Sequence, residues 1–167
     1  MAERFGKIGS KPELKPLEIA PVLDEAIKYM ERRLPKIAGE VSIKTDLQAT
    51  GLVKLNPELL QWAVENLMKN AMDALQMTQE SSNKGITVRS YTASNGMVLE
   101  IADTGIGMDA ATKKNIFRPG YSTKKRGWGL GLNLTKRIVE EYHGGELTVT
   151  KSELGVGTTM QIRLKLV

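Results

Sequence analysis

The sequence predicts an α+β fold, a two-layer α/β sandwich in which helices cover one face of a mixed, mostly antiparallel sheet. Two observations carry this prediction. Residues 20–33 and 56–77 repeat apolar side chains at the spacing of amphipathic helices. Residues 85–92 and 97–103 alternate in polarity and flank Asn95-Gly96, which favours a tight hairpin turn. Together they indicate a sheet that needs helices to cover its apolar face.

The remaining elements follow from the same two periodicities. The second long helix has a strong start, because Asn56 can cap it, Pro57 suits its first position and Glu58 complements its dipole. Five further elements are expected. They are a strand at 40–47, a short helix at 109–116, a helix at 129–142 that Gly144-Gly145 stops, and two strands at about 146–151 and 157–165.

Composition excludes several classes of function. The chain has no cysteine, which removes disulfides, thiolate catalysis and cysteine-bound zinc. Aromatic residues make up only 5%, so the core is expected to be aliphatic and methionine-rich. No apolar run approaches the ~18 residues of a membrane span, and no signal sequence is visible, so we expect a cytoplasmic domain without direct membrane contact. The net charge is +5, but no basic stripe is interleaved with aromatics, so no nucleic-acid partner is expected.

Three short polar side chains share one face of the helix at 56–77. At about 100° per residue, Asn66, Asn70 and Asp73 fall at about 0°, 40° and −20° around the helix axis. One interpretation is a solvated face, on which asparagine is tolerated. The other is a platform for magnesium and phosphate, because an amide oxygen is a hard, neutral ligand for Mg²⁺.

A carboxylate ends the apolar row of a predicted strand. Leu99, Ile101 and Asp103 point the same way, so Asp103 is half-buried and needs hydrogen-bond donors. The exocyclic amino group of adenine could supply one, and Gly105 and Gly107 would let the backbone approach a flat ring. An ordinary strand-end turn is the alternative. An aspartic protease would need two such carboxylates, and the single copy would require a homodimer.

A glycine run opens the helix at 129–142. Lys124, Lys125 and Arg126 precede Gly127-Trp128-Gly129-Leu130-Gly131, and cations beside a helix N-terminus favour phosphate. The spacing matches neither the dinucleotide-binding glycine fingerprint nor the P-loop. Any phosphate site here must therefore be of another kind.

Taken in order, these motifs resemble the catalytic domain of histidine kinases, in the ATP-binding superfamily shared with gyrase, heat-shock chaperone and mismatch-repair ATPases. The resemblance covers roughly residues 20–165. It rests on the N box Asn66–Asp73, the first glycine box Asp103–Met108, the F box Ile116–Gly120, the second glycine box Gly127–Leu132, the His143-Gly144-Gly145 helix end and the last glycine motif Gly155–Thr159.

The resemblance implies a role for each matching position. Asn70 would ligate Mg²⁺, with Asn66 beside it on the phosphate side. Asp103 would accept a hydrogen bond from the adenine amino group, and Thr158 would assist through water. The implied catalytic set is Asn66, Asn70 and Lys124, and the implied ATP-binding set is Asn66, Asn70, Asp73, Asp103, Gly105, Gly107, Lys124, Arg126, Gly127, Gly129, Leu130, Gly131 and Thr158.

Within this set, residues of about 109–128 would form the ATP lid. Lys124 is the first choice for a contact to the terminal phosphate and Arg126 the second, while the region of Gly129 and Gly131 would wrap the phosphates. The implied cofactors are ATP and Mg²⁺.

One position separates the subclasses. Gyrase-type ATPases carry a water-activating glutamate four residues before the Mg²⁺-binding asparagine, where this chain has Asn66. Glu65 is adjacent but about 100° round the helix. This favours a kinase over a hydrolase. A conformational ATPase of the gyrase or chaperone kind, a stand-alone serine kinase of the anti-sigma type and a degenerate nucleotide-binding module stay open as alternatives.

A histidine kinase also needs a phosphoacceptor. The sole histidine, His143, lies at a helix end without the acidic neighbourhood expected of an acceptor, so we interpret it as structural or on the surface. Residues 1–15 are expected to be a linker or the tail of an absent dimerisation helix, and residues 16–167 the catalytic domain. The expected partners are a histidine-containing dimerisation domain and a response regulator receiver domain. Without the former, transfer should be absent or very slow, and the resemblance is compatible with a membrane-anchored parent.

Overall fold

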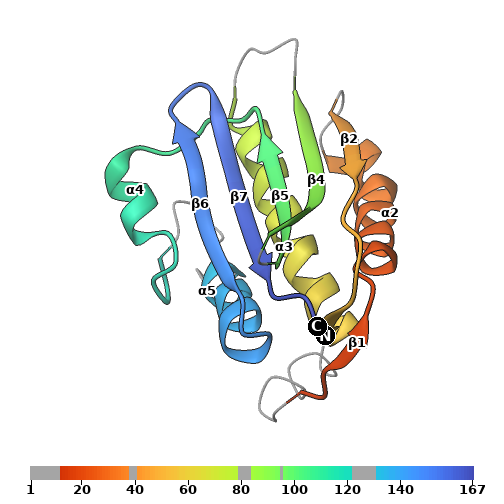
Figure 1. Cartoon of the computed structure of the whole chain (residues 1–167). Coiled ribbons are helices and arrows are strands. Elements are labelled where there is room, and N and C mark those ends of the chain that lie inside the picture. Colours follow the sequence, from red (N-terminus) through yellow and green to blue (C-terminus); the bar gives the residue numbers. More distant parts are fainter. Residues whose placement is uncertain (1–11, 38–40, 79–83, 95, 122–130) are drawn as a thin grey trace.

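The computed structural model describes residues 12–37, 41–78, 84–94, 96–121 and 131–167 (Figure 1). Single strands, pairs of strands and helices follow one another along the chain. In order they are β1 (Lys15–Leu17), α2 (Ala20–Ile37), β2 (Ser42–Leu47), β3 (Val53–Leu55), α3 (Pro57–Gln76), β4 (Gly85–Ala93), β5 (Gly96–Asp103), α4 (Ala110–Asn115), α5 (Gly131–Arg137), the π-helix η1 (Ile138–Tyr142), β6 (Glu146–Glu153) and β7 (Gly157–Leu164).

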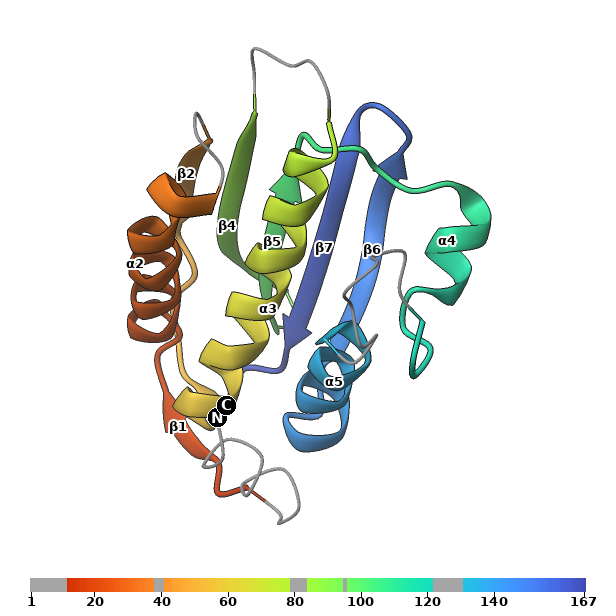
Figure 2. The same cartoon turned by 180° about the vertical axis from the view of Figure 1, so that it is seen from behind.

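Five strands form the main sheet, in the order β2-β4-β5-β7-β6. β2 and β4 pair in parallel, and the other three neighbouring pairs are antiparallel. Figure 2 shows α2, α3 and α5 on one face of this sheet. The predicted class, a two-layer α+β sandwich with a mostly antiparallel sheet, is confirmed.

Helix α3 crosses the middle of the covered face, and its start is the one that the sequence predicts. The Asn56 side chain accepts a hydrogen bond from the Leu59 backbone N–H at 3.1 Å, and Pro57 occupies the first helical position. Asparagine satisfies an N–H group that the first turn leaves without a helical partner, and proline lacks that N–H altogether. The cap therefore fixes where α3 enters the core.

The core between α3 and the sheet is aliphatic and rich in methionine, as the low aromatic content predicts. Leu60 and Leu67 of α3 are buried against strands whose inward positions include Ile86, Leu99 and Ile162. Five methionines belong to the same cluster, namely Met30, Met68, Met72, Met97 and Met160. Burial of this kind stabilises a fold by roughly 1.5–3 kcal/mol for each large side chain.

The structure adds elements that the sequence analysis missed. Strands β1 and β3 have three residues each and form a separate antiparallel pair, which is too short to give a periodic signal. Helix α2 ends at Ile37, four residues beyond the predicted end at residue 33. The predicted helix over 129–142 is described from Gly131 and changes to a π-helix at Ile138.

His143 closes this π-helix and connects it to α3. Its Nδ1 lies 2.8 Å from the Ile138 carbonyl oxygen, and its Nε2 accepts a hydrogen bond from the Asn56 backbone N–H at 3.1 Å. These partners require a neutral ring with the proton on Nδ1. Burial lowers the pKa of His143, against an opposing effect of both hydrogen bonds. A structural role for this histidine, one of the two expected, is thus observed.

Candidate nucleotide site

Asp103 is the last residue of β5, the central strand of the sheet. It lies between Ile86 of β4 and Thr158 of β7, and continues the buried row of Leu99 and Ile101 as predicted. Its Oδ1 accepts a hydrogen bond from the Gly105 backbone N–H at 2.9 Å. Burial raises the pKa of Asp103 from 3.8 to about 6, while backbone N–H groups of Gly105 and Thr158 act in the lowering direction. The carboxylate is therefore under-solvated and would gain from one more donor.

The loop after Asp103 is held by backbone hydrogen bonds to three separate elements. Thr104 donates to the Gly85 carbonyl at the start of β4 at 3.2 Å, and its hydroxyl accepts from the Gly85 N–H at 3.0 Å. Ile106 donates to the Ala74 carbonyl in α3 at 3.1 Å, and accepts from the Gly155 N–H in the β6–β7 turn at 2.8 Å. The loop is thus fixed before any ligand binds.

The glycines of this loop are required by protein packing. A Cβ on Gly105 would lie 2.6 Å from the carbonyl carbon of Ala74, and a Cβ on Gly107 would collide with the Glu153 carbonyl oxygen. Gly107 also has φ +72°, a left-handed conformation that favours glycine. The sequence analysis explained both glycines by a flat ring, whereas the structure shows α3 and β6 in the space that a Cβ would occupy.

The asparagine stripe lies on α3, the helix that the Asp103 loop contacts through Ala74. Asn66, Asn70 and Asp73 are half-buried on α3, and Asp73 immediately precedes Ala74, which bonds the loop. Glu65 points elsewhere: it is 5% exposed, and its carboxylate accepts a hydrogen bond from the Gln61 amide at 3.0 Å. Of the stripe, only the position of Asp73 is tied to the loop by a described contact, through the neighbouring Ala74.

Thr158 lies directly opposite Asp103 and belongs to a small hydroxyl cluster. Its Oγ1 is 2.8 Å from Oγ of Ser152, its partner in the β6–β7 pairing. The Ser152 hydroxyl also accepts a hydrogen bond from the Met108 backbone N–H at 2.9 Å. The sequence analysis did not single out Ser152, because only the register of β6 against β7 places it beside Thr158.

The predicted phosphate loop is described only at its end. Gly131 is the first residue of α5, and its carbonyl accepts from the Thr135 hydroxyl at 2.6 Å. Lys124, Arg126, Gly127, Gly129 and Leu130 lie outside the described residues.

The family model of histidine kinase-, DNA gyrase B- and HSP90-like ATPases matches residues 55–167. The chain belongs to this family. The match begins just before the Asn56 cap and includes the asparagine stripe, the Asp103 loop and Thr158, so the resemblance drawn from the motifs is confirmed.

Similar proteins of this ATPase family include sensor kinases. The chain is 33% identical over 152 residues to the C4-dicarboxylate transport sensor protein DctB of Rhizobium meliloti, an alignment that covers 90% of the chain and 23% of that protein. The chain thus spans about a quarter of the length of this relative.

Solved structures show the same fold. The catalytic domain of histidine kinase ThkA is 21% identical, with a TM-score of 0.77, and the alignment covers 93% of this chain and 97% of that one. Full-length ShkA in complex with AMPPNP is 21% identical, with a TM-score of 0.78, and the alignment covers 99% of this chain and 35% of that one.

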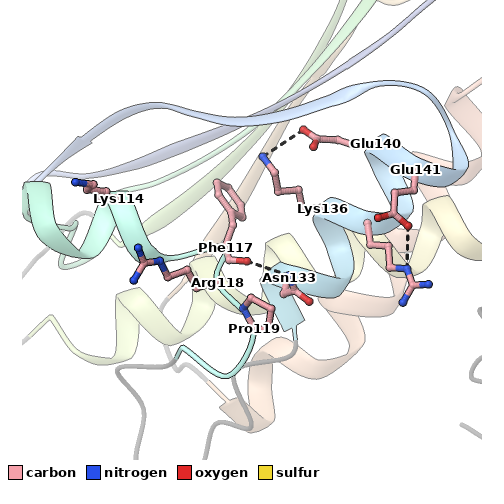
Figure 3. A pocket seen from close by; sticks show the side chains of 9 residues that line it. Lys114, Phe117, Arg118, Pro119, Asn133, Lys136, Glu140 and Glu141 are labelled. Atoms are coloured by element: carbon pink, nitrogen blue, oxygen red, sulfur yellow. Dashed lines mark hydrogen bonds and ion pairs between the residues drawn. The ribbon is translucent and has the colours of Figure 1, made fainter.

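The F box of this ATPase-family chain lies against α5. It follows the short helix α4, which was predicted over 109–116, spans Ala110–Asn115 and is capped by Asp109. The Phe117 carbonyl accepts from the Asn133 amide at 3.0 Å, and the Lys136 ammonium lies 4.6 Å from the centre of the Phe117 ring. Figure 3 shows these side chains at an open groove of about 570 Å³. Its lining comprises Lys114, Phe117, Arg118, Pro119, Asn133, Lys136, Arg137, Glu140 and Glu141.

Within the residues that the structure places, no group of three His, Cys, Asp or Glu side chains could hold a metal ion. In the same part of the chain, none of the helices is both long and apolar enough to span a membrane.

Proposed function

We propose that this chain is the ATP-binding catalytic domain of a sensor histidine kinase, and that it donates the γ-phosphoryl group of ATP to a histidine on a separate dimerisation domain. The family match supports nucleotide binding, and the resemblance to DctB supports the kinase subclass. In the parent protein the phosphoryl group would then pass to a response regulator receiver domain.

The Asp103 loop would take the adenine ring. An under-solvated carboxylate at a strand end accepts the exocyclic amino group, and Thr158 next to it assists through water. Because the loop is bonded to β4, α3 and the β6–β7 turn, the pocket would be formed in advance, which lowers the entropic cost of binding.

The asparagine stripe would take the phosphates. Asn70 would ligate Mg²⁺ through its amide oxygen, with Asn66 on the phosphate side and Asp73 next to it. The bound ion would neutralise charge on the β- and γ-phosphate oxygens during transfer. Amide donors fit this ion, because the phosphates themselves bring the negative charge.

The observation that carries the kinase assignment is the pair Asn66 and Glu65. A hydrolase of this superfamily needs a carboxylate on the stripe to activate water, and asparagine cannot act as that base. The neighbouring carboxylate of Glu65 is buried and accepts a hydrogen bond from Gln61. ATP should therefore persist until a nucleophile arrives from another domain.

The acceptor must lie outside this chain. His143 is the chain's sole histidine, and both of its ring nitrogens have protein partners at the junction of α3 and η1. Phosphorylation on either nitrogen would break one of these bonds. The dimerisation domain of the parent is therefore the proposed partner.

Parts of the proposal concern segments that the structure describes only in part. Lys124 would contact the terminal phosphate, with Arg126 as the second choice, and Gly127, Gly129, Leu130 and Gly131 would wrap the phosphates. Residues of about 109–128 would form the ATP lid. Residues 1–15 would connect to the dimerisation helix, and the domain would act in the cytoplasm, whether or not the parent is anchored in a membrane.

Calorimetry with ATP tests the site. Asn70→Ala should weaken binding of Mg²⁺·ATP but leave binding of ATP in excess EDTA unchanged, whereas Asp103→Ala should weaken both. Lys69→Ala is the matched control, because Lys69 is exposed on another face of α3 and should bind as the parent chain does. Full Mg²⁺·ATP affinity in both Asn70→Ala and Asp103→Ala would remove the site assignment.

Transfer of radiolabelled γ-phosphate tests the reaction class. The chain alone should stay unlabelled, and the dimerisation domain of its parent, added in trans, should gain an acid-labile, alkali-stable phosphohistidine. Steady hydrolysis that Glu65→Ala abolishes would show a conformational ATPase instead. Acid-stable label on a serine would show a serine kinase.

A further inference from the structure

Ser152 and Thr158 face each other across β6 and β7, beside Asp103. Their hydroxyl oxygens are 2.8 Å apart, and Thr158 is 9% exposed. The Met108 N–H, at the end of the loop that follows Asp103, donates to the Ser152 oxygen at 2.9 Å. Ser152 thus joins three parts of the proposed adenine pocket, namely β6, β7 and the loop.

Either hydroxyl can donate across the 2.8 Å contact, because the Ser152 oxygen keeps a second lone pair beside the bond from Met108. The arrangement in which Ser152 donates gives its proton a hydrogen-bond acceptor, since a half-buried hydroxyl is stabilised by donating as well as by accepting. When Ser152 donates to Thr158, the proton of Thr158 is left to point away from β6.

We propose that Ser152 is a positioning residue that turns the Thr158 hydroxyl into a donor, and so makes the pocket select adenine over a 6-oxopurine. This inference rests on the proposed placement of adenine at Asp103. Adenine presents an amino group that donates and a ring N1 that accepts. Asp103 would accept from the amino group. Thr158 would donate to N1, either directly or through a water molecule.

Hypoxanthine reverses both positions. Its 6-oxo group is an acceptor facing the Asp103 carboxylate, and its N1–H is a donor facing the Thr158 proton. The Asp103 carboxylate always disfavours the 6-oxo group, because both are acceptors. The Thr158 hydroxyl disfavours N1–H only while it is held as a donor. A hydroxyl that is free to rotate can accept from N1–H as readily as it donates to N1.

Binding of ATP and ITP to three chains tests the assignment, with the dissociation constants of both nucleotides measured by calorimetry in Mg²⁺. In Ser152→Ala, the preference for ATP over ITP should fall about five- to tenfold, the size expected for one hydrogen bond. Ser152→Thr keeps a hydroxyl at a strand position and should retain the preference of the parent chain. Thermal melting of each variant shows whether the fold is preserved.

Three results would overturn the inference. Equal loss of ATP and ITP affinity in Ser152→Ala would mean that Ser152 only braces the loop, and an unchanged ratio would mean that it does not orient Thr158. A threonine variant with the ratio of the alanine variant would also contradict a role for the hydroxyl. Asp103→Ala, measured alongside, distinguishes the two proposals. Unchanged ATP affinity in Asp103→Ala would refute the adenine site itself. Weaker ATP binding in Asp103→Ala, together with an unchanged preference for ATP over ITP in Ser152→Ala, would refute only the role of Ser152.

Discussion

Replacing Asp103 by asparagine should stabilise the ligand-free domain and at the same time weaken ATP binding. Asparagine has nearly the same shape and carries no charge to desolvate. Its side-chain oxygen can still accept from the Gly105 N–H, which lies 2.9 Å from the aspartate oxygen. The substitution therefore removes the charge and keeps the hydrogen bond from Gly105.

The size of the stabilisation follows from the pKa. Burial raises the pKa of Asp103 from 3.8 to about 6, and at about 1.36 kcal/mol per pKa unit the ionised form costs about 3 kcal/mol at neutral pH. Because the folded pKa is above the unfolded one, this cost is absent below pH 3.8 and fully present above pH 6. The gain in Asp103→Asn should approach that figure as an upper limit at pH 7 and vanish near pH 4.

Urea unfolding of both chains between pH 4 and 8 measures this difference. The free energy of unfolding of the variant minus that of the parent should rise with pH through the interval and reach a plateau above pH 6. This difference cancels the effect of His143, which is the same in both chains and changes the free energy of unfolding with pH in the opposite direction to Asp103. A variant that is less stable than the parent at pH 7, or a difference that does not depend on pH, would refute the reasoning.

The same carboxylate should make ATP binding depend on pH. Only ionised Asp103 accepts two backbone N–H groups together with the adenine amino group. The affinity for Mg²⁺·ATP should therefore be steady above about pH 7 and fall below about pH 6, the pKa of the free group. Asp103→Asn should bind more weakly and lack this dependence, which the same titration series checks.

Two further predictions concern the packing around the site. Burial lowers the pKa of His143 below 6.5, so the free energy of unfolding should decrease as pH falls below 6.5. In His143→Ala the free energy of unfolding should be about 1–3 kcal/mol lower at pH 7 and should lack this pH dependence. Urea unfolding measures both effects. Gly107→Ala should lower the melting temperature and abolish ATP binding, because its Cβ would collide with the Glu153 carbonyl. Gly155 has φ +77° but open space around its Cβ, so Gly155→Ala should lower the free energy of unfolding by only about 1 kcal/mol. Equal melting temperatures for the two glycine variants would contradict the collision.

The helices and the hairpin could be predicted because their signals are local. Asn56 and Pro57 fix the start of α3 through bonds within one turn, and the apolar alternation that ends at Asp103 requires only that one face of β5 be buried. The asparagine stripe depends on helix geometry alone. Each of these features is encoded within a few residues along the chain.

Features that depend on distant partners could not be predicted. Strand β1 forms because it pairs with β3. Its three residues are too few to show the alternating polarity that predicts a strand. The carbonyl of Glu153 explains Gly107, and the register of β6 against β7 places Ser152 beside Thr158. In each case the residues next to the constrained position do not identify its distant partner.

The sequence by itself determined the fold class, the long helices and the polar residues of the proposed site, because periodicity and capping act over single turns and strands. The tertiary structure decided what those residues do. It buries Asp103 enough to raise its pKa, turns Glu65 toward Gln61 instead of the stripe, and engages both nitrogens of His143. Desolvation and hydrogen-bond partners depend on segments far apart in the chain, so they follow only from how β5, α3 and β7 meet.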